Sequence, residues 1–228
     1  MRLSFCSDTH TMHGQLTQQV IAARPDVLVH CGDFSGHGTP EDVSKFAEWC
    51  GMLIRKQYAR HVVVIAGNHD LCLDEAHPAT RERWPSGNAT GRALFEDAGA
   101  TYLQDSGAEV CGLRFYGTPY SPRFFDWAFQ IDSEEQDRAI FEAARLATPD
   151  VLVAHGPPHG IRDLAPGNHH VGSKALRELG RGRIIAFGHI HEGYGLSLVG
   201  GTTYVNASTC TGDYEPTNPL ITIDVEPR

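Results

Sequence analysis

Val62-Val63-Val64-Ile65-Ala66-Gly67-Asn68-His69-Asp70 is the stretch from which the fold can be worked out. Its first five residues are apolar and four of them are β-branched, which is typical of a strand buried on both faces. A glycine follows, and then an amide, an imidazole and a carboxylate. Because ligands bind beyond the carboxyl ends of strands in open α/β sheets, we predict that this polar end lies in a functional site. A polar turn with a flexible glycine is the alternative.

The preceding residues alternate between strand and helix patterns. Alternating polar and apolar residues at 2–6 and an apolar run at 27–29 predict strands, and helical spacing predicts helices at 15–23 and 40–53. Together with the strand at 62–66, this order gives two βαβ units and therefore parallel strands. The polar residues that follow these strands are expected to meet at one edge of the sheet.

The rest of the chain has a different pattern of strands, helices and loops. Residues 71–92 are rich in proline, glycine and charge and predict a long surface loop. Short strands near 101–103, 108–110 and 113–116, separated by turn residues, predict a second and partly antiparallel sheet. Further strands are predicted at 151–154, 184–187, 196–199, 202–206 and 220–225, and helices at 93–98, 133–147 and 173–179, the last two with serine N-caps. No repeat or linker interrupts the pattern, so we expect one domain over residues 1–228.

Five predicted strands end in residues that can bind metals. The set comprises Asp8-x-His10, Asp33, Asn68-His69-Asp70, His155 and His189-x-His191. Imidazole and carboxylate together suit Zn, Fe, Mn, Ni or Co, and an x between two ligands on extended backbone puts both side chains on one face. Any one of these residues alone is more often a structural histidine or a solvated carboxylate, but five similar strand ends favour a site. This set exceeds the needs of one tetrahedral ion, and seven of its groups would fit two ions if Asp33 bridges them.

The series D-x-H, G-D, G-N-H-D, H-G-P-P and G-H-x-H, in this order, resembles the calcineurin-like metallophosphoesterase superfamily over residues 8–191. The resemblance implies an α/β fold with two mixed β-sheets packed as a sandwich and flanked by helices. It also implies two divalent metal ions, with Mn expected first and Fe, Zn, Co or Ni as alternatives. By resemblance, the first ion is held by Asp8, His10 and His191, the second by Asn68, His155 and His189, and Asp33 bridges the two.

The same resemblance implies roles in catalysis. A metal-bridging hydroxide would attack the phosphorus, because two cations lower the pKa of a bound water. His69 would protonate or stabilise the leaving oxygen, and Asp70 would orient the His69 ring and keep it protonated. Asn68 and His69 are expected to contact the substrate as well.

Three further motifs point to one branch of the superfamily. The chain reads AHGPP at 154–158, GHIHEGYG at 188–195, and NASTC with PTNP at 206–219. These resemble the branch of metallophosphoesterase-domain-containing proteins 1 and 2, which implies a phosphodiesterase acting on small organic phosphodiesters, 2′,3′-cyclic nucleotides included. Weakly active members of that branch bind purine monophosphates and carry glycine at the position of His189. A nucleotide-monophosphate-binding regulatory protein with weak residual catalysis is therefore the alternative, and the intact His189 disfavours it.

Residues 117–130 form a predicted irregular loop with five aromatic side chains and Arg123. The rings could stack on a base, and Arg123 could meet a phosphate, so we expect this loop to form a wall of the substrate site. The alternative is that the rings only cap the second sheet. Ala66 stands where Ser/Thr protein phosphatases carry an arginine, which disfavours protein phosphatase activity.

The amino-acid composition narrows the range of expected binding partners. Nineteen lysines and arginines against 28 aspartates and glutamates give a net charge of −9, which argues against binding bulk nucleic acid or an anionic membrane surface. The six cysteines show no C-x-x-C spacing, and we find neither a leader-like start nor a run of 18 apolar residues. We expect a cytoplasmic protein with a small-molecule phosphodiester or nucleotide as partner; the oligomeric state stays open.

Overall fold

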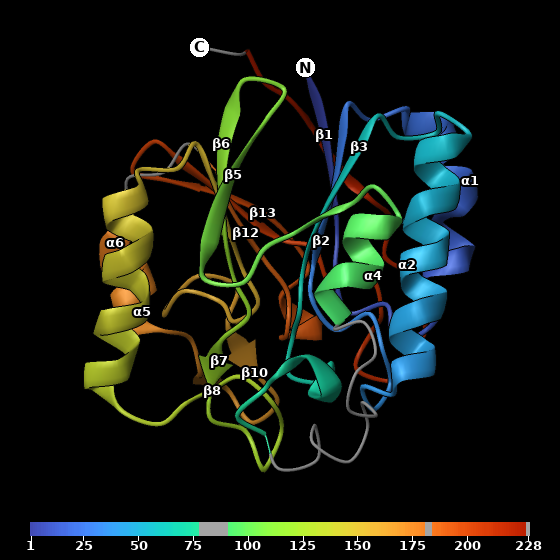
Figure 1. The fold of residues 1–228 in the computed structure, drawn as a ribbon. Helices are drawn as coiled ribbons and strands as arrows, with labels where there is room; N and C mark the ends of the chain where they lie inside the picture. The colour runs from blue at the N-terminus through green and yellow to red at the C-terminus, as the bar shows by residue number, and fades with distance from the viewer. Residues whose placement is uncertain (78–90, 181–183, 227–228) are drawn as a thin grey trace.

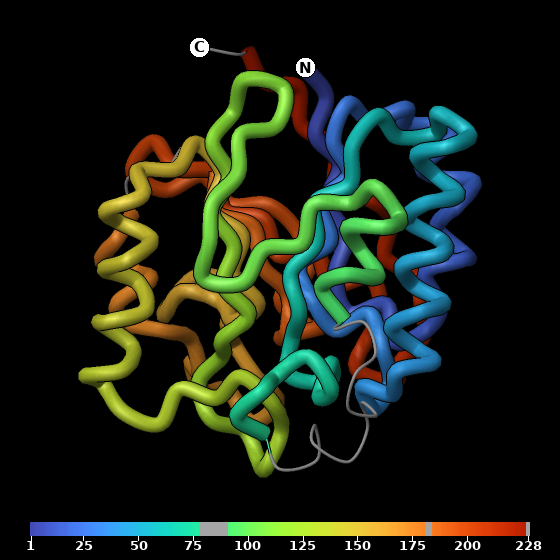
Figure 2. The backbone as a smooth tube through the Cα atoms, in the orientation of Figure 1, coloured from blue at the N-terminus to red at the C-terminus, as the bar shows by residue number. Residues whose placement is uncertain are grey.

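A computed structural model describes residues 1–77, 91–180 and 184–226. Two mixed β-sheets face each other, and helices cover the outer face of each sheet, as the ribbon in Figure 1 and the backbone tube in Figure 2 show. This four-layer arrangement confirms the predicted sandwich of two mixed sheets flanked by helices.

The first sheet has the strand order β15-β1-β2-β3-β4. Its strands are β1 (Arg2–Cys6), β2 (Val27–Cys31), β3 (His61–Ile65), β4 (Thr101–Tyr102) and β15 (Ile221–Asp224). Strands β1 to β4 are parallel, and β15 adds to the edge in antiparallel orientation. Strand β4 therefore completes the first sheet, whereas the sequence pattern had grouped residues 101–103 with the second.

The second sheet has the strand order β13-β14-β12-β9-β6-β5. Its strands are β5 (Ser106–Val110), β6 (Leu113–Thr118), β9 (Val151–Ala154), β12 (Ile184–Phe187), β13 (Gly195–Val199) and β14 (Thr202–Asn206). The four inner strands are parallel, and β5 and β13 pair antiparallel at the two edges. The prediction of a second, partly antiparallel sheet is confirmed.

Helices α1 (Thr17–Ala23), α2 (Pro40–Arg55) and α4 (Gly91–Asp97) pack on the first sheet, and α5 (Glu134–Ala147) and α6 (Lys174–Leu179) on the second. As predicted, serine side chains cap α5 and α6: Ser133 accepts a hydrogen bond from Gln136 N and Ser173 one from Leu176 N. Most of the predicted loop at 71–92 lies outside the described residues, but its start forms a 3₁₀ turn, η2 (Leu71–Leu73).

Burial on both faces explains the uninterrupted apolar runs. In β2, Val27 and Val29 point into the layer between the sheets, while Leu28 packs under the helices. In β9, Val153 points to the same inner layer and Leu152 packs against the side of α5 and α6. Alternate residues of a strand face opposite sides, so a central strand with two covered faces needs an apolar residue at every position.

The strand directions gather the loops at one end of the molecule. Two small ribbons, β7 (Ser121–Pro122) with β8 (Gln130–Ile131) and β10 (Leu164–Ala165) with β11 (His169–His170), lie at the opposite end from the N-terminus (Figure 1).

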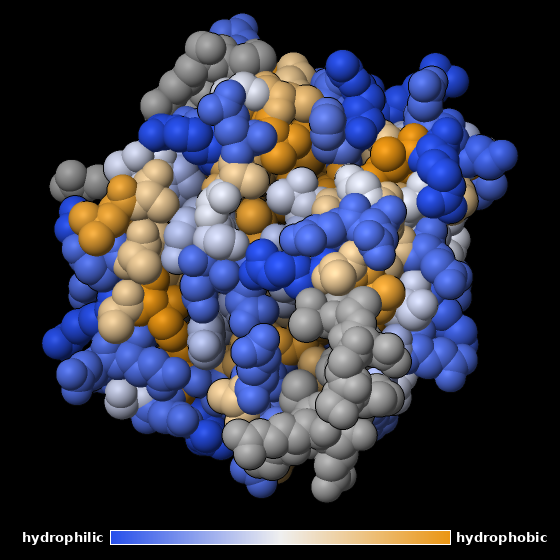
Figure 3. All heavy atoms as spheres, viewed as in Figure 1, coloured by the Kyte–Doolittle hydropathy of each residue, from blue (hydrophilic) through white to orange (hydrophobic). Residues whose placement is uncertain are grey.

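On the face shown in Figure 3, hydrophilic side chains predominate and hydrophobic ones form scattered patches. Within the described ranges, we find no helix whose length and apolar character would let it span a bilayer.

Candidate metal centre

The ends of β1, β2, β3, β9 and β12 bring the seven predicted ligands together. Potential ligand atoms fall into overlapping groups, each with all its atoms within 4.8 Å of one another: Asp8, His10 and His191; His10, Asp33 and His69; and Asp33, His155 and His189. The seventh residue, Asn68, contacts both His155 and His189. The groups draw on both sheets, so the cluster exists only because the two sheets face each other.

Several of these residues leave their strands in an unusual backbone conformation. Asp8, His10, Asp33 and His189 have φ angles of 51°, 41°, 56° and 67°, in the left-handed region that non-glycine residues rarely adopt. Backbone hydrogen bonds hold this conformation: Asp8 N donates to Gly32 O at 2.9 Å, and His10 N donates to Asp33 O at 3.1 Å. The sharp turns aim the side chains into one space beyond the sheets.

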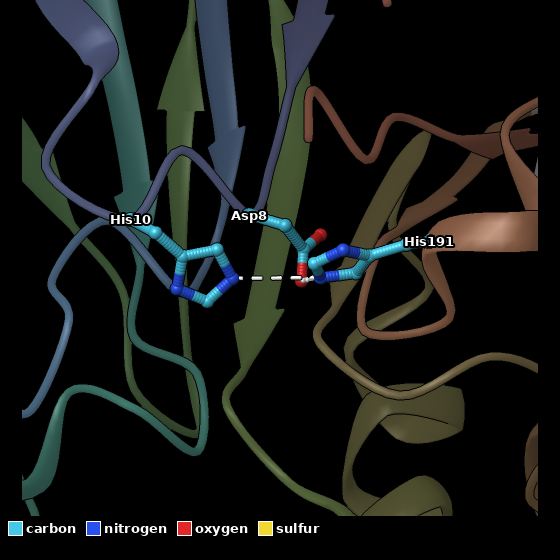
Figure 4. Close-up of side chains that lie close together, drawn as sticks. All are labelled: Asp8, His10 and His191. Carbon is cyan, nitrogen blue, oxygen red and sulfur yellow. Dashed lines mark hydrogen bonds and ion pairs between the residues drawn. The ribbon is translucent and has the colours of Figure 1, made fainter. Parts of the chain in front are cut away.

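The first cluster consists of Asp8, His10 and His191, whose side chains point toward one another (Figure 4). The Nε2 atoms of His10 and His191 are 3.4 Å apart, and His191 Nε2 is 3.5 Å from Asp8 Oδ1. The Nδ1 atoms face away and lie 3.2 Å from Ser35 O and 2.7 Å from Thr211 O. A ring that donates Nδ1–H to a carbonyl keeps its Nε2 lone pair free for a metal, so this cluster fits a cation between the three side chains.

The second cluster is built around Asn68. Its Oδ1 lies 2.9 Å from His155 Nε2 and 2.8 Å from His189 Nδ1. His155 Nδ1 lies 2.9 Å from Cys31 O on the far side of the ring, which fixes this imidazole as the first cluster's rings are fixed. These donors also converge on one point, and they fit a second cation.

Asp33 lies between the two clusters. Its Oδ2 is 3.3 Å from His155 Nε2, and it also shares a potential ligand group with His10. The residue is 2 % exposed, and its Oδ1 accepts a hydrogen bond from His69 N at 2.7 Å. This position suits a carboxylate that serves two ions at once.

Electrostatics favour cations at both clusters. Burial alone would lower the pKa of His155, but the charge of Asp33 raises it to about 9. Burial likewise opposes protonation of His191, and the contact with Asp8 raises its pKa to about 9. Burial lowers the pKa of His189 to about 4. The carboxylates that draw protons onto His155 and His191 create the negative potential that would attract divalent ions.

The glycines that precede the candidate ligands are required because a Cβ atom at these positions would collide with the site. A Cβ at Gly32 would lie 2.6 Å from His155 Nδ1, and one at Gly67 would lie 2.6 Å from His155 Cε1. A Cβ at Gly188 would collide with the Asp8 carboxylate. The glycine in each of the G-D, G-N-H and G-H-x-H motifs therefore lets strand ends from the two sheets approach closely.

The expected contact between Asp70 and the His69 ring is wrong. The Asp70 carboxylate accepts hydrogen bonds from the backbone N–H of Asp33, Ser35 and Gly67, and from the Ser35 hydroxyl. The Nδ1 of His69 instead lies 2.7 Å from the carbonyl oxygen of Gly36. Asp70 therefore holds the loop that carries Asp33, and a backbone carbonyl orients His69.

A pocket of about 710 Å³ opens over the cluster. Asp33, Asn68, His69, His189 and His191 lie on its metal side, and Arg123, Phe124 and Tyr214 are among its other lining residues. Arg123 lines this pocket, but its guanidinium forms an ion pair with Asp132 and a second one, at 3.6 Å, with Asp126. Two carboxylates thus already contact the charge that was expected to meet a phosphate.

Sequence patterns missed two features of this site. Tyr214 packs edge-on against His10 with 4.8 Å between ring centroids, and its ring is 5.5 Å from that of His191. The carbonyl of Thr211, three residues earlier, contacts His191. No spacing rule indicated either contact, because the loop after β14 reaches the cluster only through the packing of β14 beside β12.

Comparisons with known proteins agree with this geometry. The calcineurin-like phosphoesterase profile matches residues 1–193. Human metallophosphoesterase domain-containing protein 1 is 38% identical over 238 residues, covering 96% of this chain and 69% of the relative. A UPF0046 protein of Caenorhabditis elegans, K07C11.7, is 32% identical over 220 residues, covering 94% of this chain and 72% of the relative.

The likeness extends to solved structures. The crystal structure of TT1561 from Thermus thermophilus superimposes with a TM-score of 0.58 at 12% identity, covering 90% of this chain and 88% of that one. At that identity the match supports the fold alone. The profile match, the identity with the human relative and the ligand cluster agree: the chain belongs to the calcineurin-like phosphoesterase family.

Proposed function

We propose that this chain is a metal-dependent phosphodiesterase that hydrolyses small organic phosphodiesters, with 2′,3′-cyclic nucleotides as the first substrates to test. Family membership supports phosphoester hydrolysis in general. The choice of diesters over monoesters rests on one observation, the charge of the pocket above the clusters.

That pocket offers little positive charge beyond the two metals. Arg123 is the one lysine or arginine among its described lining residues, and carboxylates contact its guanidinium. Glu192 adds a negative charge to the lining. A phosphomonoester carries close to two negative charges at neutral pH, whereas a diester carries one. The diester therefore needs less compensation and fits this pocket better.

The residues of the site would have separate roles in the proposed hydrolysis. Asp8, His10, Asp33, Asn68, His155, His189 and His191 would hold the two ions, which supply Lewis acidity and an activated water. His69 lines the pocket beside Asp33, from where its imidazole would donate a proton to the leaving oxygen. The Gly36 carbonyl at Nδ1 directs Nε2 away from that carbonyl.

A matched pair of substrates tests the proposal. Bis-p-nitrophenyl phosphate and p-nitrophenyl phosphate share a leaving group and differ in phosphate charge. We expect kcat/KM to be at least about tenfold higher for the diester, which is about 1.4 kcal/mol of transition-state preference, with Mn²⁺ and then with Zn²⁺, Co²⁺, Ni²⁺ and Fe²⁺. Equal rates, or a preference for the monoester, would contradict the proposal. A panel of cyclic nucleotides then identifies the natural diester.

The regulatory alternative makes a different prediction. A nucleotide-monophosphate-binding protein with weak catalysis would not depend on His189, because its function would be binding. We expect His189→Gly to keep purine monophosphate binding and to lose most diesterase activity at limiting metal, with partial recovery in excess Mn²⁺. Equal activity of variant and wild type at low metal would mean that His189 is not a ligand.

We further propose a cytoplasmic location and a small-molecule partner. The six cysteines are free thiols, which suits a reducing compartment. The net charge of −9 disfavours long nucleic acids as substrates.

A further inference from the structure

The segment that follows β14 crosses from the second sheet to the first and ends beside the first cluster. Asn206 is the last residue of β14, and Ser208 pairs with Ser7, just after β1, through an isolated parallel bridge. Thr209 N continues this pairing by donating to Ser7 O at 2.8 Å. The NASTC motif at 206–210 therefore joins the two sheets at the point where β1 ends and its candidate ligands begin.

Within this motif, the Ser208 hydroxyl contacts the Asp8 carboxylate. Ser208 Oγ lies 3.0 Å from Asp8 Oδ2, and both residues are fully buried. The backbone N–H of His189 also donates to this carboxylate, at 3.0 Å from each oxygen. Asp8 Oδ1 lies on the side of His191, 3.5 Å from its Nε2. A hydroxyl that donates to a carboxylate makes a charge-assisted hydrogen bond, which here fixes Oδ2 and leaves Oδ1 directed at the cluster.

Asn206 holds the serine in the orientation that this hydrogen bond needs. The Asn206 Nδ2 donates to Ile190 O at 2.8 Å, so its Oδ1 faces Ser208 and accepts from Ser208 N at 3.1 Å. Ser208 Oγ is 2.9 Å from this Oδ1 and 3.0 Å from Asp8 Oδ2. A hydroxyl has one hydrogen to donate, and the charged Asp8 oxygen is the stronger acceptor. Because Ile190 is the x of the G-H-x-H motif, Asn206 also ties the serine to the loop that carries two candidate ligands.

We propose that Ser208, held by Asn206, is a positioning residue that orients the Asp8 carboxylate for the ion of the first cluster, an inference that goes beyond the proposed function because it concerns metal binding alone. Without the hydroxyl, the buried carboxylate would keep the hydrogen bond from His189 N but lose its second anchor. The first ion should then bind more weakly. Asp8 is not part of the second cluster, so the second ion should bind nearly as before.

Calorimetric titration with Mn²⁺ measures both binding steps, and the step that is lost in His191→Ala identifies the first cluster. Ser208→Ala should weaken this step by roughly 10–100-fold, the range for groups that orient metal ligands, and should leave the other step close to wild type. Ser7→Ala is the matched control. Ser7 is equally buried and lies across the same bridge, but its hydroxyl donates to Gly32 O at 3.2 Å. This variant should leave both steps close to wild type.

Asn206→Ala should weaken the same step as Ser208→Ala. Its effect and that of Ser208→Ala should add to less than their sum in the double variant, because both residues act through one hydrogen bond. Urea unfolding of each variant without metal shows whether it folds, and Ser208→Ala, which removes a single oxygen atom, decides the test if Asn206→Ala does not fold.

Three outcomes would overturn the positioning role. Ser208→Ala could leave the first step unchanged, it could weaken both steps equally, or it could have the same effect as Ser7→Ala. The last two would mean that a general loss of packing accounts for the change. Metal binding is measured without substrate, so a failure to hydrolyse diesters would reject the proposed phosphodiesterase and leave this result untouched.

Discussion

Four of the seven candidate ligands sit on left-handed backbone: Asp8, His10, Asp33 and His189. Each such residue costs roughly 1–2 kcal/mol relative to ordinary backbone, and the cost is accepted where the surrounding structure fixes the conformation and the site needs the direction. Residue types and spacing predicted which side chains gather at the strand ends. They did not predict these dihedrals, which depend on hydrogen bonds between loops of different strands.

Asp70 is the residue whose role differs from the sequence prediction. Its carboxylate accepts four hydrogen bonds that position the Asp33 loop. Asp70→Asn replaces one acceptor oxygen with an amide donor facing these N–H groups. We expect metal affinity to fall roughly 10–100-fold, as for other groups that position ligands. Isothermal titration with Mn²⁺ measures this, and unchanged affinity would contradict the positioning role.

Substitution of His69 tests whether this residue donates a proton to the leaving oxygen. His69→Ala should leave both metals bound and should slow hydrolysis more for a substrate with an alkoxide leaving group than for one that releases p-nitrophenolate, which leaves without a proton. The measurement compares kcat/KM for both substrates in wild type and variant, with metal content as control. Equal losses on the two substrates would show that His69 only binds the phosphoryl group.

At the scale of elements, the strands and helices followed local patterns closely. The runs that end in Asp8, Asp33 and Asn68 are strands of one sheet, and those before His155 and His189 belong to the other. The pairing of β4 with β3 was not predictable, because two residues carry too little pattern to choose a sheet. The contact of Asp70 with Ser35 was equally unpredictable, because these two residues meet only across neighbouring loops.

Two helix caps allow a matched stability test. Ser133 accepts from Gln136 N at 3.1 Å at an exposed helix start. Ser173, 3% exposed, accepts from Leu176 N and also donates to Asp137 Oδ1 at 2.5 Å. Ser133→Ala should cost about 1 kcal/mol of unfolding free energy, and Ser173→Ala about 2–3 kcal/mol, because a buried carboxylate loses a donor. Urea unfolding of the metal-loaded variants gives both values, and equal costs would mean that the hydrogen bond from Ser173 to Asp137 adds no stability.

The packing under α2 predicts a pH dependence of stability. His13 lies against Phe46 and Trp49, and burial lowers its pKa to about 4. The unfolded chain takes up this proton near pH 6.5, so the stability is fully present above that pH and is lost as the pH falls toward 4. His13→Phe should flatten the slope by up to about 1.4 kcal/mol per pH unit. An unchanged slope in His13→Phe would refute the assignment.

At the scale of the whole molecule, the site is a property of two facing sheets. The first sheet carries Asp8, His10, Asp33 and Asn68, and the second carries His155, His189 and His191. The strand patterns predicted two sheets but not how the two sheets face each other. The facing arrangement was predicted from the order of the motifs, through the family resemblance. The profile match confirms that family. The expectation of a single domain over residues 1–228 stays a prediction.

Anomalous scattering from Mn²⁺-loaded crystals would test the dinuclear site, because it locates each ion and shows which side chains contact it. We expect two peaks about 3.5–4 Å apart. One should lie among Asp8, His10 and His191, the other among Asn68, His155 and His189, with the Asp33 carboxylate between them in contact with both. A single ion, or two ions that do not share Asp33, would contradict this arrangement.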